Sequence, residues 1–209
     1  MRSKPRCKAL IWPLLVVLLA ACQPSAPLPV FKSTDITGAP FGRDFYLTDH
    51  NNRARRLEDF KGKVVLLFFG YTHCPDVCPA TLSEFAAALK KIGPQANKVQ
   101  VLFVTLDPER DTPALLAQYV PAFNPSFLGL YGSAAQTQAV AQEFKIVYQK
   151  NAPEDAKSSY TLDHSAGSFA FDPAGRLRLL IPYGQGSSEI AHDLQVLLRE
   201  TNSSSQLNR

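Results

Sequence analysis

An unbroken apolar run at Val64–Phe69, followed closely by two cysteines, constrains the fold of this chain most strongly. The run shows no alternation of apolar and polar residues, as expected for a strand covered on both faces of a sheet. Cys74 and Cys78 come next, and apolar residues then recur at helical spacing, at Leu82, Phe85, Leu89 and Ile92. We therefore expect both cysteines where a central strand passes into a helix.

The order of the remaining apolar segments predicts the architecture. A second run at 99–106 leads through the loop 107–113, with Asp111 or Thr112 as N-cap, into another helix. Such a strand–helix–strand unit forms a right-handed parallel crossover. Further segments predict a helix near 140–144, a short strand at 146–149, a hairpin of 169–171 with 177–181, and a last amphipathic helix. Parallel strands followed by an antiparallel hairpin indicate an α/β fold, a thioredoxin-like single domain whose central mixed sheet is flanked by helices.

The N-terminus has the pattern of a secretory signal. Basic residues precede the apolar stretch 10–19, which ends in Leu19-Ala20-Ala21-Cys22 and resembles a bacterial lipobox. We expect residues 1–21 to be a lipoprotein signal peptide and Cys22 to carry the lipid. The alternative is an uncleaved membrane anchor, but a spanning helix needs about 20 apolar residues, and this run is shorter and contains Pro13.

The mature chain divides into three parts. Residues 22–42 are rich in Pro, Ser, Thr and Gly and are expected to form a flexible tether. Residues 43–201 have the size of one domain with a single core. The polar residues 202–209 are expected to form a disordered tail.

The basic character of the whole sequence comes from its signal. Residues 1–21 contain four of the 22 Lys and Arg residues and none of the 18 Asp and Glu residues, which leaves 18 basic and 18 acidic residues. The sequence pI near 8.9 therefore gives no support for nucleic-acid binding.

Signal removal and lipidation would use two of the four cysteines, Cys7 and Cys22, and leave the other pair as free thiols. Cys74 and Cys78 are four residues apart, so one helical turn can bring both sulfurs toward a single ion. Thiolates are soft ligands suited to Cu(I), and an added imidazole makes a site that also holds Cu(II). We expect the N–H groups of the helix start to lower the pKa of both thiols.

Three segments together, 69–82, 106–113 and Leu162-Asp163-His164-Ser165, resemble the Sco/SenC family. The similarity covers about residues 41–201. These are thioredoxin-fold, membrane-tethered copper proteins that serve assembly of the CuA centre of cytochrome c oxidase. The resemblance implies that His164 joins the cysteines in binding one copper ion per chain, Cu(I) or Cu(II). Asp163 is then expected to orient the imidazole.

Other polar residues compete for roles near the cysteines. His73 is the main rival of His164, but its side chain should diverge from that of Cys74, so a gating or surface role is preferred. His50 and His192 are expected to be solvated. Turn and cap roles explain Asp107 and Asp111 as well as any role at the metal, and they are not expected to be ligands.

Zinc binding, dithiol exchange and peroxide reduction are the other chemistries that two cysteines on this fold allow. A structural zinc site needs four protein ligands, and the sequence offers no convincing fourth. A thiol-disulfide oxidoreductase could use the two thiols, but thioredoxin-type enzymes have two residues between the cysteines and here there are three. Where such enzymes usually carry a cis-proline, this chain has His164-Ser165-Ala166. A peroxidase role is favoured only by Thr72 near Cys74.

The expected function is a copper metallochaperone rather than an enzyme. Its partners would be the CuA-bearing subunit of cytochrome c oxidase, a periplasmic copper carrier and, through the lipid, a membrane. An inner-membrane client favours the periplasmic face of the inner membrane, with the outer membrane as the alternative. The competing expectation is an extracytoplasmic oxidoreductase that keeps the CuA cysteines of the client reduced.

Overall fold

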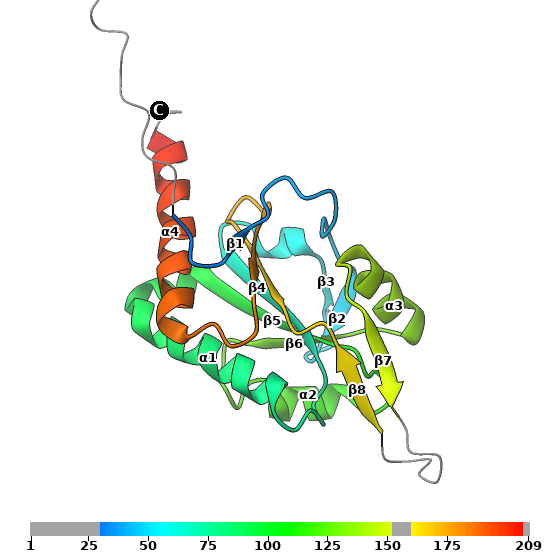
Figure 1. Cartoon of the computed structure of the whole chain (residues 1–209). Coiled ribbons are helices and arrows are strands. Elements are labelled where there is room, and N and C mark those ends of the chain that lie inside the picture. The colour runs from blue at the N-terminus through cyan, green and yellow to red at the C-terminus, as the bar shows by residue number, and fades with distance from the viewer. Residues whose placement is uncertain (1–29, 152–159, 207–209) are drawn as a thin grey trace, which may run out of the picture.

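The computed structural model describes residues 30–151 and 160–206 of the 209-residue chain (Figure 1). Its strands are β1 (Thr34–Asp35), β2 (Leu47–Asp49), β3 (Ala54–Arg55), β4 (Val64–Gly70), β5 (Val99–Thr105), β6 (Leu128–Tyr131), β7 (Tyr148–Asn151), β8 (Thr161–His164), β9 (Ser168–Phe171) and β10 (Leu177–Ile181). Its α-helices are α1 (Val77–Ile92), α2 (Pro113–Tyr119), α3 (Ala134–Glu143) and α4 (Ser187–Gln206). Short 3-10 helices cover Leu57–Phe60 and Gly93–Lys98.

The large sheet has the strand order β1-β10-β9-β4-β5-β6-β2-β3. β4 lies in its interior, parallel to β5 and antiparallel to β9, and every residue of β4 is buried. β9 and β10 form the antiparallel hairpin that the sequence predicts. The predicted central strand and the thioredoxin-like mixed sheet are thus confirmed.

Alternation along β4 gives each face of the sheet its own aromatic core. On one face, Phe68 packs 6.0 Å from Phe103, ring centre to ring centre, beneath α1 and its neighbour α4. On the other face, Phe69 packs 5.3 Å from Phe144, which follows α3. Burial of each such ring contributes about 1.5–3 kcal/mol. The two cores hold the end of β4, and hence the cysteine segment, in a fixed place.

Residues 30–42 differ from the expected flexible tether, because they lie against the domain. β1 extends the sheet by pairing with β10. The buried carboxylate of Asp193 accepts hydrogen bonds from the backbone N–H groups of Lys32 and Ser33 at 2.7 and 2.8 Å. Apolar side chains among the polar ones, Phe31, Ile36, Ala39 and Phe41, also pack on the core. The folded part therefore begins near residue 30 rather than at 43.

Residues 202–206 differ from the expected disordered tail, because they are helical. α4 continues through Gln206 because no glycine or proline interrupts it. The predicted signal at 1–21, Cys22, the start of the tether at 22–29 and the end of the tail at 207–209 lie outside the described residues. Within 30–151 and 160–206, no helix has the length and apolar character that crossing a membrane requires.

A small second sheet bears directly on the site. The strand expected at 146–149 is β7, shifted to 148–151, and it pairs antiparallel with β8. β8 is not predicted from the sequence, because its exposed Thr161 and Asp163 leave only Leu162 as a buried apolar residue. This two-stranded ribbon extends beyond the end of β4 (Figure 1).

Candidate metal centre

Both cysteines lie between β4 and the first turn of α1, as the sequence predicts. Asp76 is the N-cap residue, but its side chain makes no capping hydrogen bond. The backbone N–H of Cys78 instead donates to Cys74 Sγ at 3.4 Å. A sulfur thus occupies the position where helix N-termini favour negative charge.

His164 reaches the same point from the end of β8. Its Nε2 lies 3.7 Å from Cys78 Sγ, and the ligand atoms of Cys74, Cys78 and His164 all lie within 4.8 Å of one another. The Nδ1 atom lies 3.0 Å from the carbonyl oxygen of Ser165, which can only accept. Nδ1 therefore carries the ring proton, and Nε2 presents a lone pair toward the sulfurs.

Asp163 does not orient this imidazole, contrary to the expectation. Successive side chains of a strand point to opposite faces, so Asp163 is directed away from His164. Its carboxylate accepts a hydrogen bond from the amide of Asn151. The backbone of Ser165 performs the orienting task, and a backbone carbonyl leaves no signal in the sequence.

The buried side of the centre is apolar and closely packed. Cys78 is fully buried, and a Cβ atom at Gly70 would lie only 2.7 Å from its Sγ. The rings of Phe68 and Tyr71 each lie 6.2 Å from the imidazole of His164. Gly70 is a functional position that sequence reasoning missed, and its signal was a glycine at the end of an otherwise bulky strand.

Burial dominates the electrostatics of the buried thiol. It raises the pKa of Cys78 well above the usual value, and a backbone hydrogen bond from Tyr71 opposes this only in part. The expected lowering of the pKa by the helix start is therefore wrong for Cys78. At neutral pH this sulfur carries a proton that a metal ion must displace.

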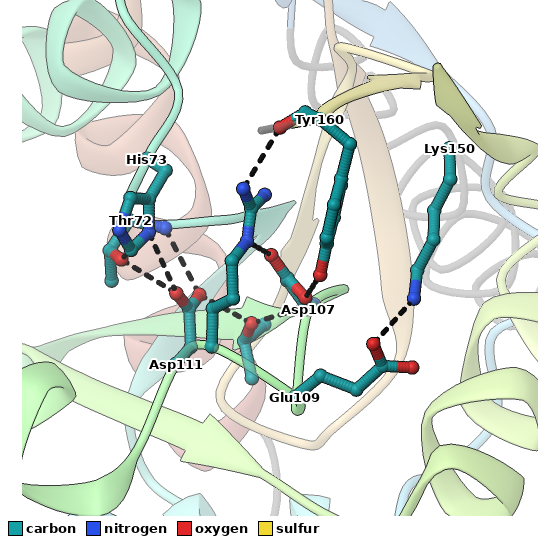
Figure 2. A network of polar contacts seen from close by, with 9 residues as sticks. Thr72, His73, Asp107, Glu109, Asp111, Lys150 and Tyr160 are labelled. Atoms are coloured by element: carbon teal, nitrogen blue, oxygen red, sulfur yellow. Dashed lines mark hydrogen bonds and ion pairs between the residues drawn. The ribbon is translucent and has the colours of Figure 1, made fainter. Parts of the chain in front are cut away.

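The loop between β5 and α2 holds Thr72 in place, and with it the cysteine segment, residues 71–78 (Figure 2). Asp111 is buried, and its carboxylate accepts from the N–H and the hydroxyl of Thr72 at 3.0 and 2.6 Å and from the Thr105 hydroxyl at 2.6 Å. Thr112, not Asp111, is the N-cap of α2. Asp107 is buried in the same loop. Neither carboxylate belongs to the three-residue metal cluster.

The other histidines lie apart from the cluster. His73 is half exposed and its Nδ1 contacts the Thr72 hydroxyl at 3.1 Å, in keeping with a surface role. His50 is not simply solvated: its Nδ1 accepts from the Gly129 N–H at 3.0 Å, and burial lowers its pKa. His192 lies 3.0 Å from the carbonyl of Val30.

A cleft of about 420 Å³ opens beside the cluster. Cys74 and His164 line it, together with Asp76 and Thr161. Cys78 closes the inner side of the centre, while Cys74 is only partly buried. An approaching group can therefore reach one sulfur and the imidazole without unfolding the domain.

The donor set fits a soft ion with an open coordination position. Two sulfurs and one imidazole nitrogen suit copper, whereas a closed structural zinc site has four protein ligands. Within 30–151 and 160–206 the cluster contains three ligand residues. Both cysteines are free thiols, and none of the peptide bonds in these ranges is cis.

Comparison with known proteins agrees with this geometry. The SCO1/SenC family model matches residues 33–199. Protein SCO2 homolog, mitochondrial, of Bos taurus is 43% identical over 134 residues, which are 63% of this chain and 50% of the relative, so the chain spans about half of that relative's length. Copper-bound ScoI of Bradyrhizobium japonicum is 39% identical with a TM-score of 0.68, covering 74% of this chain and 98% of ScoI. Apo Sco1 of Thermus thermophilus is 41% identical with a TM-score of 0.73, and the match covers 83% of this chain and 100% of Sco1. The resemblance inferred from the three motifs is therefore confirmed, and the chain belongs to the SCO1/SenC family.

Proposed function

We propose that this protein is a copper metallochaperone that binds one copper ion through Cys74, Cys78 and His164 and delivers it to the CuA centre of cytochrome c oxidase during assembly. The convergence of the three ligand atoms within 4.8 Å carries the proposal. The copper-bound relative from Bradyrhizobium japonicum supports the choice of metal.

The division of burial among the ligands favours transfer over permanent retention. Cys78 anchors the ion from the buried side, whereas Cys74 and His164 face the cleft. Incoming thiolates and imidazoles of a partner can replace these accessible ligands one at a time. The partners proposed are the CuA-bearing subunit of the oxidase and, for loading, a periplasmic copper carrier.

The proposed location follows from the lipobox. Lipidation of Cys22 would hold the domain at the periplasmic face of the inner membrane, where an oxidase client lies. Seven residues separate Cys22 from Val30, the first described residue, so a fully extended connection would span about 26–29 Å.

The first test is copper stoichiometry and the visible spectrum of the reduced protein lacking residues 1–25, beside its His164→Ala variant. We expect the parent to bind one Cu(II) with sulfur-to-copper charge-transfer bands, and the variant to lose or shift those bands. Cells that carry only His164→Ala should assemble little CuA. An intact CuA signal in these cells would remove His164 from the copper-ligand role.

A thiol-disulfide oxidoreductase is the second candidate, and the unequal exposure of the two thiols favours it. Cys74 is accessible to a client disulfide, and Cys78 lies behind it as a resolving thiol. His164 separates the two functions, because dithiol exchange does not need an imidazole. Exchange with a model disulfide should therefore survive His164→Ala even where copper binding does not.

Copper affinity should rise with pH because burial raises the pKa of Cys78. The thiol is protonated in the metal-free protein at neutral pH and deprotonated when it binds copper. Release of this one proton alone raises the apparent affinity by about tenfold per pH unit. Competition with a Cu(I) chelator of known pH dependence, between pH 6 and 8, measures the slope. A flat profile would mean that Cys78 binds no metal or is already ionised.

A further inference from the structure

A polar network around the buried carboxylates of Asp107 and Asp111 joins the loop 107–111 to Thr72 and to Tyr160 (Figure 2). At one end, Asp111 holds Thr72, two residues before Cys74. At the other end, Asp107 accepts a hydrogen bond of 2.6 Å from the hydroxyl of Tyr160. Tyr160 immediately precedes β8, the strand that ends at His164.

Arg110 completes the second half of the network. Its Nε donates to the Asp107 carboxylate, and its Nη1 donates to the backbone carbonyl of Tyr160 at 2.9 Å. The guanidinium also stacks on the Tyr160 ring, 3.6 Å from the ring centre, and lies 5.8 Å from the ring centre of Tyr71. Ring, hydroxyl and main chain of Tyr160 are thus held by one carboxylate–guanidinium pair.

Two connections join the loop 107–111 to the β7–β8 ribbon, and the contacts of Asp107 and Arg110 with Tyr160 are the more buried of the two. The Nη2 atom of Arg110 is buried with no hydrogen-bond partner among the described residues. Buried N–H groups without partners are rare. An exposed ion pair, Lys150 with Glu109, already links the β7–β8 ribbon to the same loop, and such pairs contribute little.

We propose that Tyr160 is a positioning residue: clamped by Asp107 and Arg110, it sets the place of β8 so that His164 reaches the sulfurs of Cys74 and Cys78. The inference rests on the proposed copper function of that cluster. The two cysteines are held by β4, α1 and Asp111, and the hydrogen bonds of Tyr160 within the described residues go to Asp107 and Arg110 instead. The clamp therefore acts on the imidazole ligand and not on the thiolates.

Tyr160 is suited to a donor role over the whole physiological pH range. Burial, and then its hydrogen bond to Asp107, raise the pKa of Tyr160 to about 12. Its hydroxyl keeps the proton that it donates to the Asp107 carboxylate. The hydrogen bond to Asp107 is therefore not lost by ionisation of Tyr160 in this pH range.

The test is Tyr160→Phe, which removes the hydroxyl and keeps the ring over Arg110. We expect Cu(I) affinity, which two thiolates can supply, to stay unchanged. Cu(II) affinity should fall about tenfold, the low end for loss of an outer partner of a ligand. The nitrogen coupling in the electron paramagnetic resonance spectrum of the Cu(II) form should weaken toward that of His164→Ala. In the metal-free protein, the amide hydrogens of β8 should exchange faster while those of α1 do not.

The matched control is Tyr131→Phe, which removes a similar phenol hydrogen bond, to Asn52, outside the network. Arg110→Lys is the second test variant, because lysine keeps the positive charge but cannot make the two guanidinium hydrogen bonds or stack on the Tyr160 ring. Equal loss of Cu(I) and Cu(II) affinity in both test variants would show general destabilisation and overturn the positioning role. An unchanged Cu(II) spectrum would overturn it too. A parent protein that binds no copper would instead refute the proposed function, and β8 exchange in the metal-free variants would still test the clamp.

Discussion

Cys78→Ala is expected to abolish tight copper binding. Four-ligand zinc sites in small proteins gain about 10–16 kcal/mol from metal binding, or about 2.5–4 kcal/mol per ligand. Loss of one sulfur should therefore weaken Cu(I) binding by about 60- to 700-fold, on the scale of 1.4 kcal/mol per tenfold. Cys78 is the buried ligand of the three, and its Sγ lies 3.7 Å from His164 Nε2, so its removal leaves one sulfur and one imidazole for the ion.

The experiment is a competition titration with a Cu(I) chelator on the reduced proteins. Thr81→Ala is the control, since Thr81 lies one turn further along α1 and, among the residues that the structure describes, its hydroxyl donates to the Val77 carbonyl alone. Thr81→Ala should lower the free energy of unfolding by roughly 1 kcal/mol, about as much as the loss of the buried sulfur does. It should leave the copper affinity unchanged. If Cys78→Ala kept an affinity within about tenfold of the parent, the loss would be at most about 1.4 kcal/mol and too small for a ligand.

The part of the site that is local in sequence could be predicted from the sequence. The apolar run 64–69 requires a buried strand, and the cysteines follow it within one loop and one helical turn, so their meeting depends on local geometry alone. The structure adds Gly70, which makes room for the Cys78 sulfur. The strand that carries these residues is central because it lacks any polar face.

His164 could not be placed by such reasoning. It lies 86 residues after Cys78, on a short strand whose side chains are mostly polar. Its position depends on Tyr160, Arg110 and Asp107, which in the sequence look like ordinary loop residues. The family resemblance indicated the histidine, but not the clamp that holds it.

The lowered pKa expected for both cysteines is wrong for Cys78, because burial raises the pKa by more than the helix N-terminus lowers it. A helix N-terminus stabilises a negative charge by at most about 2 kcal/mol. Complete burial shifts a pKa by up to about 3–5 units, or about 4–7 kcal/mol at 1.36 kcal/mol per unit. The sequence shows the helix start, whereas the burial appears only when the Gly70 backbone, Phe103 and α1 are assembled around the sulfur.

Asp111→Ala is expected to be the most damaging substitution outside the ligands. It removes the acceptor of three hydrogen bonds, two from Thr72 and one from Thr105. The threonine hydroxyls can turn to other partners, but the Thr72 N–H cannot. Loss of these bonds should lower the free energy of unfolding by about 3 kcal/mol, measured by urea denaturation of the reduced, metal-free protein.

Asp111→Asn should cost much less, about 1 kcal/mol, because its amide can reproduce most of the pattern. The amide oxygen can accept from the Thr72 N–H and the Thr105 hydroxyl, and the amide NH₂ can donate to the Thr72 hydroxyl once that group rotates. Asp163→Ala, at an exposed carboxylate near the same site, is the control and should change stability by less than about 0.5 kcal/mol. Equal losses for Asn and Ala at position 111 would mean that the negative charge, and not the geometry of the acceptors, holds the cysteine segment in place.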